Sequence, residues 1–526
     1  MPQARGSVRH LHLILGDQLD EDAHLASGFD PAVDVFVMAE VHEEAATVPC
    51  HQRRLAFFFA AMRHLRQRLE ARQCKVDYHA LTHDPEQDAV TSLPEALEAA
   101  VMRHRPLAIR ALEPGDWRVR EQIAARAKSL GVPLSFIPDP HFLCSLDEFR
   151  VHARGRKSLI LETFYRQMRR KHRVLIDDDG QPAEGAWNFD AANRASFGRQ
   201  GPPPITPPRR FTPDAITADV IEMVRTRFTN HPGSLEDFDL PVTPDEARLA
   251  LNDFVSHRLP NFGLHEDAMW TDEMVLYHSR LSMLLNVKLL APRACLDAAV
   301  AAWEEGLAPI NSVEGFVRQI LGWREFIRGV YWLHMPQYAE LNYFDHQEKL
   351  PAFYWTGDTD MQCLRQSLKH VVAHGYAHHI HRLMVMGLFA QLLGVHPHAF
   401  HQWHMAMYLD AIDWVSLPNT LGMSQYGDGG IVGTKPYCAS GNYIQKMSPF
   451  CKNCRYRPDR ATGPHACPFT TLYWDFLARH AEKLDANPRM GFQMSNLRRR
   501  LEGSPDEMDE IRRQADRLRA SLARED

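Results

Sequence analysis

The sequence predicts an α/β N-terminal domain built on a doubly wound parallel sheet, followed by a large all-α C-terminal domain. Three observations predict this fold. Short β-branched runs alternate with amphipathic stretches over the first 140 residues, the composition changes between residues 141 and 215, and the remainder has helical periodicity with little strand-like alternation. We therefore expect an α/β domain at 1–140, an interdomain linker at 141–215 and a helical domain at 216–526.

The first domain shows a regular alternation of strands and helices. Helical stripes of apolar residues run through Cys50–Gln73, Leu93–Arg105 and Asp116–Leu130. Strands that are separated by helices form a parallel sheet with helices on both faces. The predicted strands are His10–Leu15, Val33–Val41, Lys75–Leu81, Leu107–Leu112 and Leu134–Ile137.

A ligand site is expected beyond the carboxyl ends of these strands, where doubly wound sheets bind their ligands. Gly16-Asp17-Gln18 follows the first strand, and Glu40 to Glu44 follows the second. No Gly-x-Gly-x-x-Gly follows either strand, which argues against an ordinary dinucleotide-binding fold.

The segment 141–215 has little periodicity and contains Pro202-Pro203-Pro204, as expected for a long linker that wraps around its neighbours. It includes the densest basic run of the chain, formed by Arg166, Arg169, Arg170, Lys171 and Arg173. This run is either a solvated helix face or a stripe that contacts phosphates.

Helix starts are recognisable in the third part. Thr243 with Glu246, and Asn311 with Glu314, have the spacing of a capping box, and the second pair precedes the apolar Phe316–Tyr331 run. We therefore expect a helix to begin at each pair.

Charge and hydropathy restrict the class of protein. Sixty Lys and Arg against 66 Asp and Glu give a net charge of −6, so the chain as a whole does not attract polyanions, and nucleic acid would need a local basic surface. The longest apolar run, Leu55–Met62, is far shorter than the roughly 20 residues of a membrane-spanning helix, and no signal peptide opens the chain. We expect a cytoplasmic protein that does not bind membranes and whose cysteines are reduced.

The cysteines indicate a metal site. Cys451-x-x-Cys454 and Cys467 supply three thiolates in a loop-rich stretch. A tetrahedral site needs a fourth ligand, and the candidates are Cys363, Cys438 and His465. The spacing does not decide between zinc and an iron–sulfur cluster.

Histidines are dense between Tyr376 and His404. Helical spacing would place His378 and Arg382 on one face, with His379 about 100° away. Because histidine titrates near neutrality, such a cluster suits proton transfer to a substrate whose charge has just changed.

Several motifs of the chain resemble those of photolyases and cryptochromes. Tyr277–Ser282, Trp323-Arg-Glu-Phe326 and His378-His379-x-x-Arg382 are similar to segments of that superfamily. A closer resemblance, running from the first strand to about Phe476, is to its iron–sulfur bacterial branch, which comprises the prokaryotic (6-4) photolyases and related cryptochromes. The motifs that carry it are Leu13–Leu19, Trp187–Asp190, Leu417–Gln425 and Gly433–Tyr437.

This resemblance implies the photolyase/cryptochrome architecture and three cofactors. They are FAD, a [4Fe–4S] cluster and an antenna chromophore, 6,7-dimethyl-8-ribityllumazine. The implied FAD residues are Tyr277, Ser279, Ser282, Gln319, His379, Arg382 and Asp410; the cluster ligands are Cys363, Cys451, Cys454 and Cys467; the antenna residues are Asp17 and Glu44; and the electron-transfer residues are Trp403 and Trp355.

The implied function is blue-light-driven repair of (6-4) photoproducts in UV-damaged DNA by electron transfer from reduced FAD, carried out by a monomer. His378 or His379 would donate a proton, and Tyr437 would line the lesion pocket. The chain departs from its relatives at three positions. Leu383 stands where animal (6-4) photolyases carry a second histidine. In the bacterial branch, glutamate is usual at the position of Ser416, and tyrosine is frequent at the position of His404.

Two further hypotheses stay open at this point. A cryptochrome-type photoreceptor would use the same cofactors without repair, and sequence does not separate signalling from catalysis. The histidine pair and the basic run favour repair. Independently of the resemblance, Cys451–Cys467 could form a zinc module of a non-enzymatic nucleic-acid-binding protein.

Overall fold

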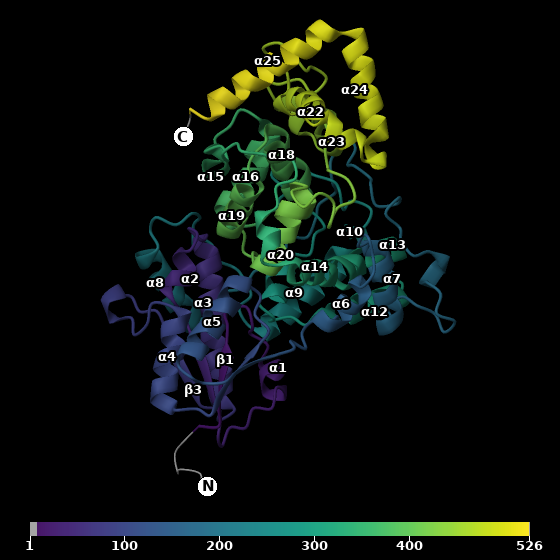
Figure 1. The fold of residues 1–526 in the computed structure, drawn as a ribbon. Coiled ribbons are helices and arrows are strands. Elements are labelled where there is room, and N and C mark those ends of the chain that lie inside the picture. Colours follow the sequence, from purple (N-terminus) through teal and green to yellow (C-terminus); the bar gives the residue numbers. More distant parts are fainter. Residues whose placement is uncertain (1–7, 525–526) are drawn as a thin grey trace.

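The computed structural model describes residues 8–524 and contains one five-stranded sheet near the N-terminus (Figure 1). All neighbouring strands are parallel, and their order is β3-β2-β1-β4-β5. Each strand lies inside a predicted one. The strands are β1 (His10–Ile14), β2 (Val35–Ala39), β3 (Val76–His79), β4 (Ala108–Leu112) and β5 (Leu134–Ile137).

Helices cover both faces of this sheet, which confirms the doubly wound prediction. The face formed by Leu11, Leu13 and Val37 packs against α4 and α5, whereas Ile14 and Phe36 pack with α3 on the other face. The three predicted helices of this domain are α3 (Gln52–Ala71), α4 (Leu93–His104) and α5 (Trp117–Ser129), and the short α1 (Glu21–Ala26) and α2 (His42–Ala46) follow β1 and β2.

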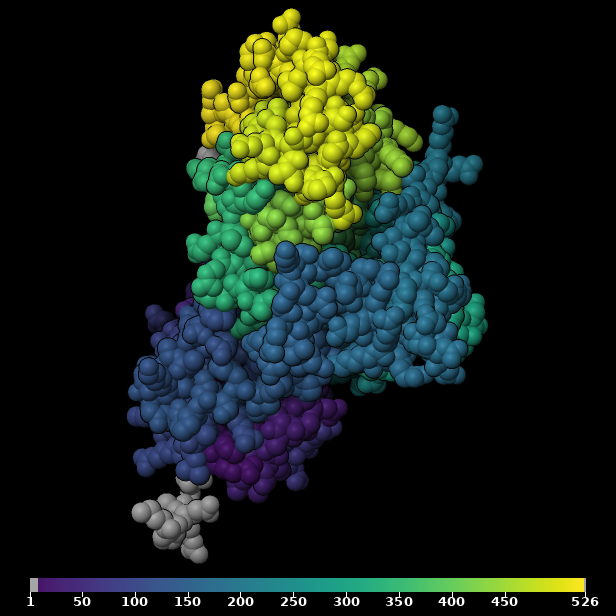
Figure 2. All heavy atoms as spheres, turned by 45° about the vertical axis from the view of Figure 1, so that its right-hand side comes forward, coloured from purple at the N-terminus to yellow at the C-terminus, as the bar shows by residue number. Residues whose placement is uncertain are grey.

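The segment 141–215 contains two helices, α6 (Leu146–Ala153) and α7 (Leu161–His172), followed by a long stretch with little regular structure. Coloured blue in Figure 2, it runs along one side of the molecule. The basic run lies on α7, and its members differ. Arg169 is fully buried and donates to the carbonyl oxygens of Val174, Leu175 and Trp187, so it is a structural residue.

The rest of the chain is helical, and α8 packs beside α3 of the N-terminal domain (Figure 1). The α-helices are α8 (Ala215–Arg227), α9 (Pro244–His257), α10 (Leu259–Phe262), α11 (Ser282–Asn286), α12 (Pro292–Glu304), α13 (Ile310–Val317), α14 (Glu325–His334), α15 (Phe353–Thr356), α16 (Gln362–His374), α17 (His379–His381), α18 (Leu388–Leu393), α19 (Pro397–Met407), α20 (Asp413–Leu417), α21 (Gly441–Met447), α22 (Pro468–Arg479), α23 (Ala481–Asp485), α24 (Gly491–Gly503) and α25 (Pro505–Leu522).

The two predicted capping boxes have different outcomes. The Thr243 hydroxyl accepts from the backbone N–H of Glu246 and the Glu246 carboxylate accepts from that of Thr243, so this box is confirmed. At Asn311 the helix start is confirmed, because α13 begins at Ile310, but the capping box is wrong. Pro309 is the N-cap of α13, and the Asn311 amide lies inside the helix and donates to Asn193 instead.

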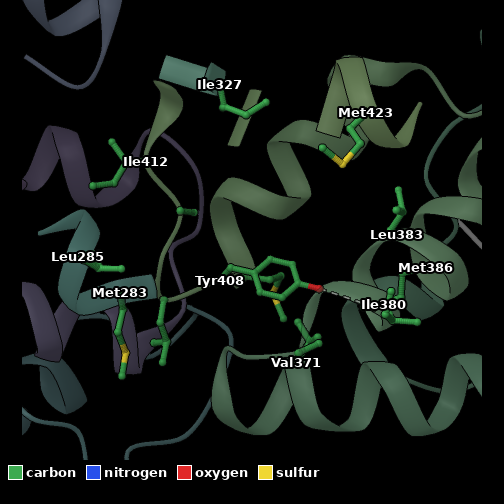
Figure 3. Packing of buried hydrophobic residues seen from close by; sticks show 14 of the residues in the cluster. Met283, Leu285, Ile327, Val371, Ile380, Leu383, Met386, Tyr408, Ile412 and Met423 are labelled. Atoms are coloured by element: carbon green, nitrogen blue, oxygen red, sulfur yellow. Dashed lines mark hydrogen bonds between the residues drawn. The ribbon is translucent and has the colours of Figure 1, made fainter. Parts of the chain in front are cut away.

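Three π-helical turns interrupt the helices that carry the candidate site: η3 (Arg318–Arg324), η5 (Arg382–Gly387) and η6 (Pro418–Ser424). Such turns occur often at functional sites. Between them lies the apolar packing of Figure 3, where Leu285, Ile327, Leu383 and Met423 belong to the core and also line a cavity. No helix of the described residues is both long and apolar enough to cross a membrane.

Candidate active site, cysteine pocket and sheet-edge cavity

A cavity of about 840 Å³ lies in the helical domain, and we call it the helical-domain cavity. Its wall joins residues from the loop before α11, from the three π-helical turns and from the 433–447 region. Most of the predicted flavin and catalytic residues line it: Ser279, Ser282, Gln319, His378, His379, Arg382, Asp410 and Tyr437.

Tyr277 is the exception among the predicted flavin residues. It does not line the cavity, and its buried ring stacks on His265 with 5.7 Å between ring centroids. Its neighbour His278 takes the place in the wall. The motif therefore locates the correct loop, but it does not tell which side chains of the loop face inward.

Arg382 and Asp410 form a two-pronged ion pair in the cavity wall. Arg382 Nη1 and Nη2 donate to the two carboxylate oxygens of Asp410 at 3.0 and 3.1 Å, and the Ser282 hydroxyl donates to Asp410 at 2.6 Å. Burial alone would raise the pKa of Asp410. The Arg382 guanidinium and these hydrogen bonds outweigh burial and hold that pKa below its usual value. The pair fixes the side chains for a ligand in the cavity.

The histidine pair stands at the start of α17, which begins one residue later than the sequence spacing suggested. His378 is the N-cap residue with an extended backbone, so the prediction that it shares a helical face with Arg382 is wrong. Both His378 and His379 still line the cavity. His379 is open to the cavity, and desolvation by the surrounding wall, with help from Arg382, lowers its pKa to about 4, whereas His378 is buried, which lowers its pKa well below the usual value.

Sequence reasoning missed several residues of the cavity wall. Glu266 accepts a hydrogen bond from the Gln319 amide at 3.0 Å, and burial raises the pKa of its carboxyl to about 8. Arg194, Lys435 and Lys446 bring positive charge to the same wall. Lys435 lies within the Gly433–Tyr437 motif, but no motif surrounds the other three residues, and only the fold brings the four together.

The cysteine pocket gathers four thiols from three separate segments. Cys363 of α16, Cys451, Cys454 and Cys467 at the start of α22 line it, together with apolar residues, whereas Cys438 and His465 do not. Gly441 leaves space there, because a Cβ at this position would lie 2.7 Å from Cys467 Sγ. Burial and the neighbouring thiols raise the pKa of Cys363.

The spacing of these thiols is wider than a single zinc ion needs. In the described residues, the one trio of candidate ligand atoms lying within 4.8 Å of one another is His10, His12 and Asp34, so no three of the four thiols are that close. Sulfurs around one tetrahedral zinc are about 3.8 Å apart, given a Zn–S bond of about 2.3 Å. Asp34 already accepts four hydrogen bonds, from Arg9 and two backbone N–H groups, which leaves it no lone pair for an ion.

The two predicted electron-transfer residues differ in exposure. Trp403 is 1% exposed, stacks on the cavity residue Phe400 with 5.7 Å between ring centroids, and donates its N–H to the Tyr354 carbonyl oxygen at 3.0 Å. Trp355, which follows Tyr354 in α15, is 37% exposed. An aromatic route thus leads from the cavity towards the surface.

The sheet-edge cavity, of about 380 Å³, lies where the sequence predicted a ligand site, beyond the carboxyl ends of β1, β2 and β4. Asp17 and Glu44 both line it, and α19 closes it from the helical domain. Arg118 donates to both oxygens of Glu44, at 2.8 and 2.7 Å. Asp17 Oδ2 is buried without a hydrogen-bond partner in the described part of the chain.

Comparisons with known proteins agree with this architecture. The class III photolyase of Agrobacterium tumefaciens (TM-score 0.55, 14% identity, 85% of this chain and 88% of that one) and a Synechocystis cryptochrome (TM-score 0.53, 14% identity, 92% and 95%) have similar structures. Residues 12–240 match the family model of the deoxyribodipyrimidine photo-lyase-related proteins. An Agrobacterium fabrum protein named (6-4) photolyase is 45% identical over 485 residues, which cover 92% of this chain and 94% of that protein.

The fold is thus that of the photolyase and cryptochrome class, as the sequence predicted. Within that class, the chain belongs to the family of deoxyribodipyrimidine photo-lyase-related proteins.

Proposed function

We propose that the chain is a (6-4) DNA photolyase, an enzyme that uses blue light to repair (6-4) pyrimidine–pyrimidone photoproducts by electron transfer from reduced FAD. The observation that carries this proposal is that a single cavity gathers His378, His379 and Tyr437 with the expected flavin residues. The relative named (6-4) photolyase supports the same substrate. A lesion reaches such a cavity by turning out of the duplex, which costs least at a damaged, poorly stacked base.

The polar atoms of the cavity wall fit FAD. Arg280 Nε, Ser416 Oγ and His404 Nδ1 are buried without a partner among the described residues, and such atoms are costly unless a ligand or water pairs with them. When bound and reduced, FAD supplies one electron to the lesion under blue light and recovers it after repair. The residues that hold it are Ser279, Ser282, Gln319, His379, Arg382 and Asp410, with Tyr277 in support from behind the wall.

His378 and His379 move the proton that repair requires. Desolvation by the surrounding protein lowers the pKa of both rings, so both are neutral at pH 7 before DNA binds. The phosphates of bound DNA bring negative charge, which raises the pKa of a nearby histidine. A histidine protonated in this way gives its proton to the lesion and takes it back, so that no proton is consumed overall. Tyr437, which lines the same cavity as Lys435, contributes to the lesion pocket.

UV-damaged DNA is the partner, although the net charge of the chain is −6. Arg194, Lys435 and Lys446 supply the local positive charge that phosphates need. A monomer suffices for repair because one chain provides the whole cavity wall. We place the protein in the cytoplasm, where thiols that bind a metal stay reduced.

The cysteine pocket fits a [4Fe–4S] cluster held by Cys363, Cys451, Cys454 and Cys467. Four thiols face one small space, and they lie farther apart than the ligands of a single zinc ion. The space next to Gly441, which a Cβ would fill, supports this assignment. The wide spacing also disfavours the hypothesis of a zinc module in a non-enzymatic protein.

The sheet-edge cavity fits the antenna chromophore, 6,7-dimethyl-8-ribityllumazine. Its volume suits a ligand of this size, and the unpaired Asp17 Oδ2 offers an acceptor for a ribityl hydroxyl or a ring N–H. Glu44 is held in place by Arg118 for the same purpose. Trp403 and Trp355 carry electrons inward from the surface when the flavin is photoreduced, along the aromatic route described above.

The alternative function is that of a cryptochrome-type blue-light photoreceptor without repair activity. The Synechocystis cryptochrome, which shares the fold, favours keeping this alternative. An oligonucleotide that carries one (6-4) photoproduct separates the two functions. Repair predicts loss of the lesion under blue light but not in the dark, whereas a photoreceptor would undergo flavin photoreduction and leave the lesion intact.

A further inference from the structure

Three buried histidine rings stack beside the helical-domain cavity. The rings of His278 and His378 lie parallel with 4.2 Å between centroids, and His381 meets His378 edge to face at 4.3 Å. Both nitrogens of His378, Nε2 of His278 and Nε2 of His381 are buried without a partner among the described residues. Only His278 and His378 line the cavity, so His381 lies behind them.

A hydrogen-bond chain determines which nitrogen of His381 carries the proton. Ser367 Oγ lies 2.9 Å from the Cys363 carbonyl oxygen and 2.6 Å from His381 Nδ1. A serine hydroxyl has a single proton, and a carbonyl oxygen can only accept. The hydroxyl therefore donates to Cys363 and accepts from His381, which puts the His381 proton on Nδ1 and leaves Nε2 as a bare acceptor.

We propose that His381 is a positioning residue for proton transfer, held by Ser367 in the Nδ1–H tautomer so that its bare Nε2 stabilises the protonated form of His378. The inference rests on the proposed repair function. His378 then carries the proton that goes to the lesion, and His381 acts through it without touching DNA or flavin. No proton is gained or lost in this arrangement, because the one given by His378 returns after repair.

The titratable side chains that face His378 are all histidines. The titratable groups that face it are His278 on the loop before α11, His370 of α16, and His379 and His381 of α17. Burial lowers the pKa of His381 to about 3 and that of His278 to about 3, so both stay neutral at working pH. A neutral His381 ring with a bare Nε2, 4.3 Å from the His378 ring between centroids, favours a cation on His378, whereas an Nε2–H would oppose one.

The tautomer itself is the first test. Long-range proton–nitrogen NMR spectra of the flavin-loaded protein in the dark, with His381 assigned from the His381→Phe spectrum, distinguish Nδ1–H from Nε2–H. We expect Nδ1–H in the wild type and in Ser367→Thr, which keeps the hydroxyl, and a mixture of tautomers in Ser367→Ala. An Nε2–H tautomer in the wild type would overturn the inference.

The second test is the pH profile of repair. If His378 must be protonated, repair falls as pH rises through the pKa of His378 in the DNA complex. Ser367→Ala and His381→Phe lower that pKa, so their activity should fall at a pH about one unit lower than in the wild type. Ser367→Thr should restore the profile. Ser312→Ala, which removes another fully buried hydroxyl of the same domain, should leave it unchanged.

The two tests separate this inference from the proposed function. A wild-type protein that repairs nothing would refute photolyase activity, and the His381 tautomer would still be measurable. Equal pH profiles for Ser367→Ala and Ser312→Ala, in an active enzyme, would overturn the role of His381 and leave the repair function intact.

Discussion

The helical-domain cavity and the sheet-edge cavity differ in how their polar groups are paired. In the first, His378, Arg280 and Ser416 have nitrogen or oxygen atoms without partners among the described residues. In the second, most charged groups pair with one another: Arg118 with Glu44, and His401 and Tyr331 with Asp413. The wall of the helical-domain cavity thus keeps polar atoms free for a ligand, whereas most polar groups of the sheet-edge cavity already have hydrogen-bond partners.

This difference suggests different roles. Unpaired buried polar atoms reduce stability, and they persist where a ligand or a reaction uses them. Charges that are already paired within each domain shape a site that only has to accommodate a chromophore. Changes in the helical-domain cavity should therefore stop chemistry, whereas changes in the sheet-edge cavity should reduce efficiency.

The largest expected effect is on proton transfer. His378→Ala and His379→Ala should each reduce light-driven repair at least about 100-fold while flavin stays bound and photoreducible, because a positioned acid contributes about 10²–10⁴ to a rate. Repair is measured on the lesion oligonucleotide and flavin by its absorption. His257→Ala, at the end of α9 and in the wall of neither cavity, is the matched control and should repair normally. Full activity of both cavity variants would remove histidine from the mechanism.

The ion pairs of the two cavities offer a second comparison. Arg382→Ala leaves Asp410 buried and uncompensated, so the free energy of unfolding should fall by about 3 kcal/mol and flavin should be lost. Arg118→Ala breaks the more exposed pair with Glu44 and should cost no more than about 1 kcal/mol. Denaturant unfolding of both variants measures the difference, and equal losses would contradict the contrast drawn here.

Cys363→Ala tests the cysteine pocket, which lies apart from both cavities. Removing one of four ligands should reduce the iron and sulfide content of the purified protein to a small fraction of the wild-type level. Cys438→Ala should keep both, because Cys438 lies outside the pocket. Zinc in place of iron in the wild type, or iron retained by Cys363→Ala, would count against the cluster.

A smaller effect is expected at the sheet edge. Glu44→Ala should lower antenna binding and reduce repair several-fold under light that the antenna absorbs, with little change under light that the flavin absorbs directly. Glu43→Ala, whose side chain lies outside the cavity, is the control. An equal loss at both wavelengths would show that Glu44 acts on something other than the antenna.

The smallest effect concerns pH and stability. Burial and the nearby Asp413 raise the pKa of Asp116 to about 7, from the ordinary 3.8. Between pH 4 and pH 7 the Asp116 carboxyl is ionised in the unfolded chain but protonated in the folded chain. Its contribution to the free energy of unfolding therefore falls as the pH rises from 4 to 7, and it remains low above pH 7. Asp116→Asn should raise Tm by a few degrees at pH 8 and not at pH 4. A gain of the same size at both pH values would contradict this account.

Much of the fold could be predicted from sequence because its signals are local. The five strands were predictable because apolar runs of four to nine residues alternate with helical stripes, and Thr243 with Glu246 marks a helix start by itself. The predicted capping box at Asn311 does not form, because the Asn311 side-chain amide instead makes a tertiary hydrogen bond to Asn193. Local spacing also failed at His378, because α17 starts after it.

The candidate site was predictable only as far as motifs reach. The resemblance indicated Arg382 and Asp410, which line the helical-domain cavity, and the four cysteines, which line the cysteine pocket. Glu266 and Lys446 belong to no motif, and the loop of Tyr277 gives no periodicity from which an inward direction could be read. Long-range packing decides such positions, and a single sequence does not encode it in a recognisable pattern.

The most direct test of the account is the structure of the flavin-loaded protein bound to a duplex with one (6-4) photoproduct. We predict that the lesion lies outside the base stack and inside the helical-domain cavity, with a nitrogen of His378 or His379 within hydrogen-bond distance of it and Tyr437 against it. A lesion that remains stacked in the duplex, or one bound at a surface remote from these histidines, would contradict the account.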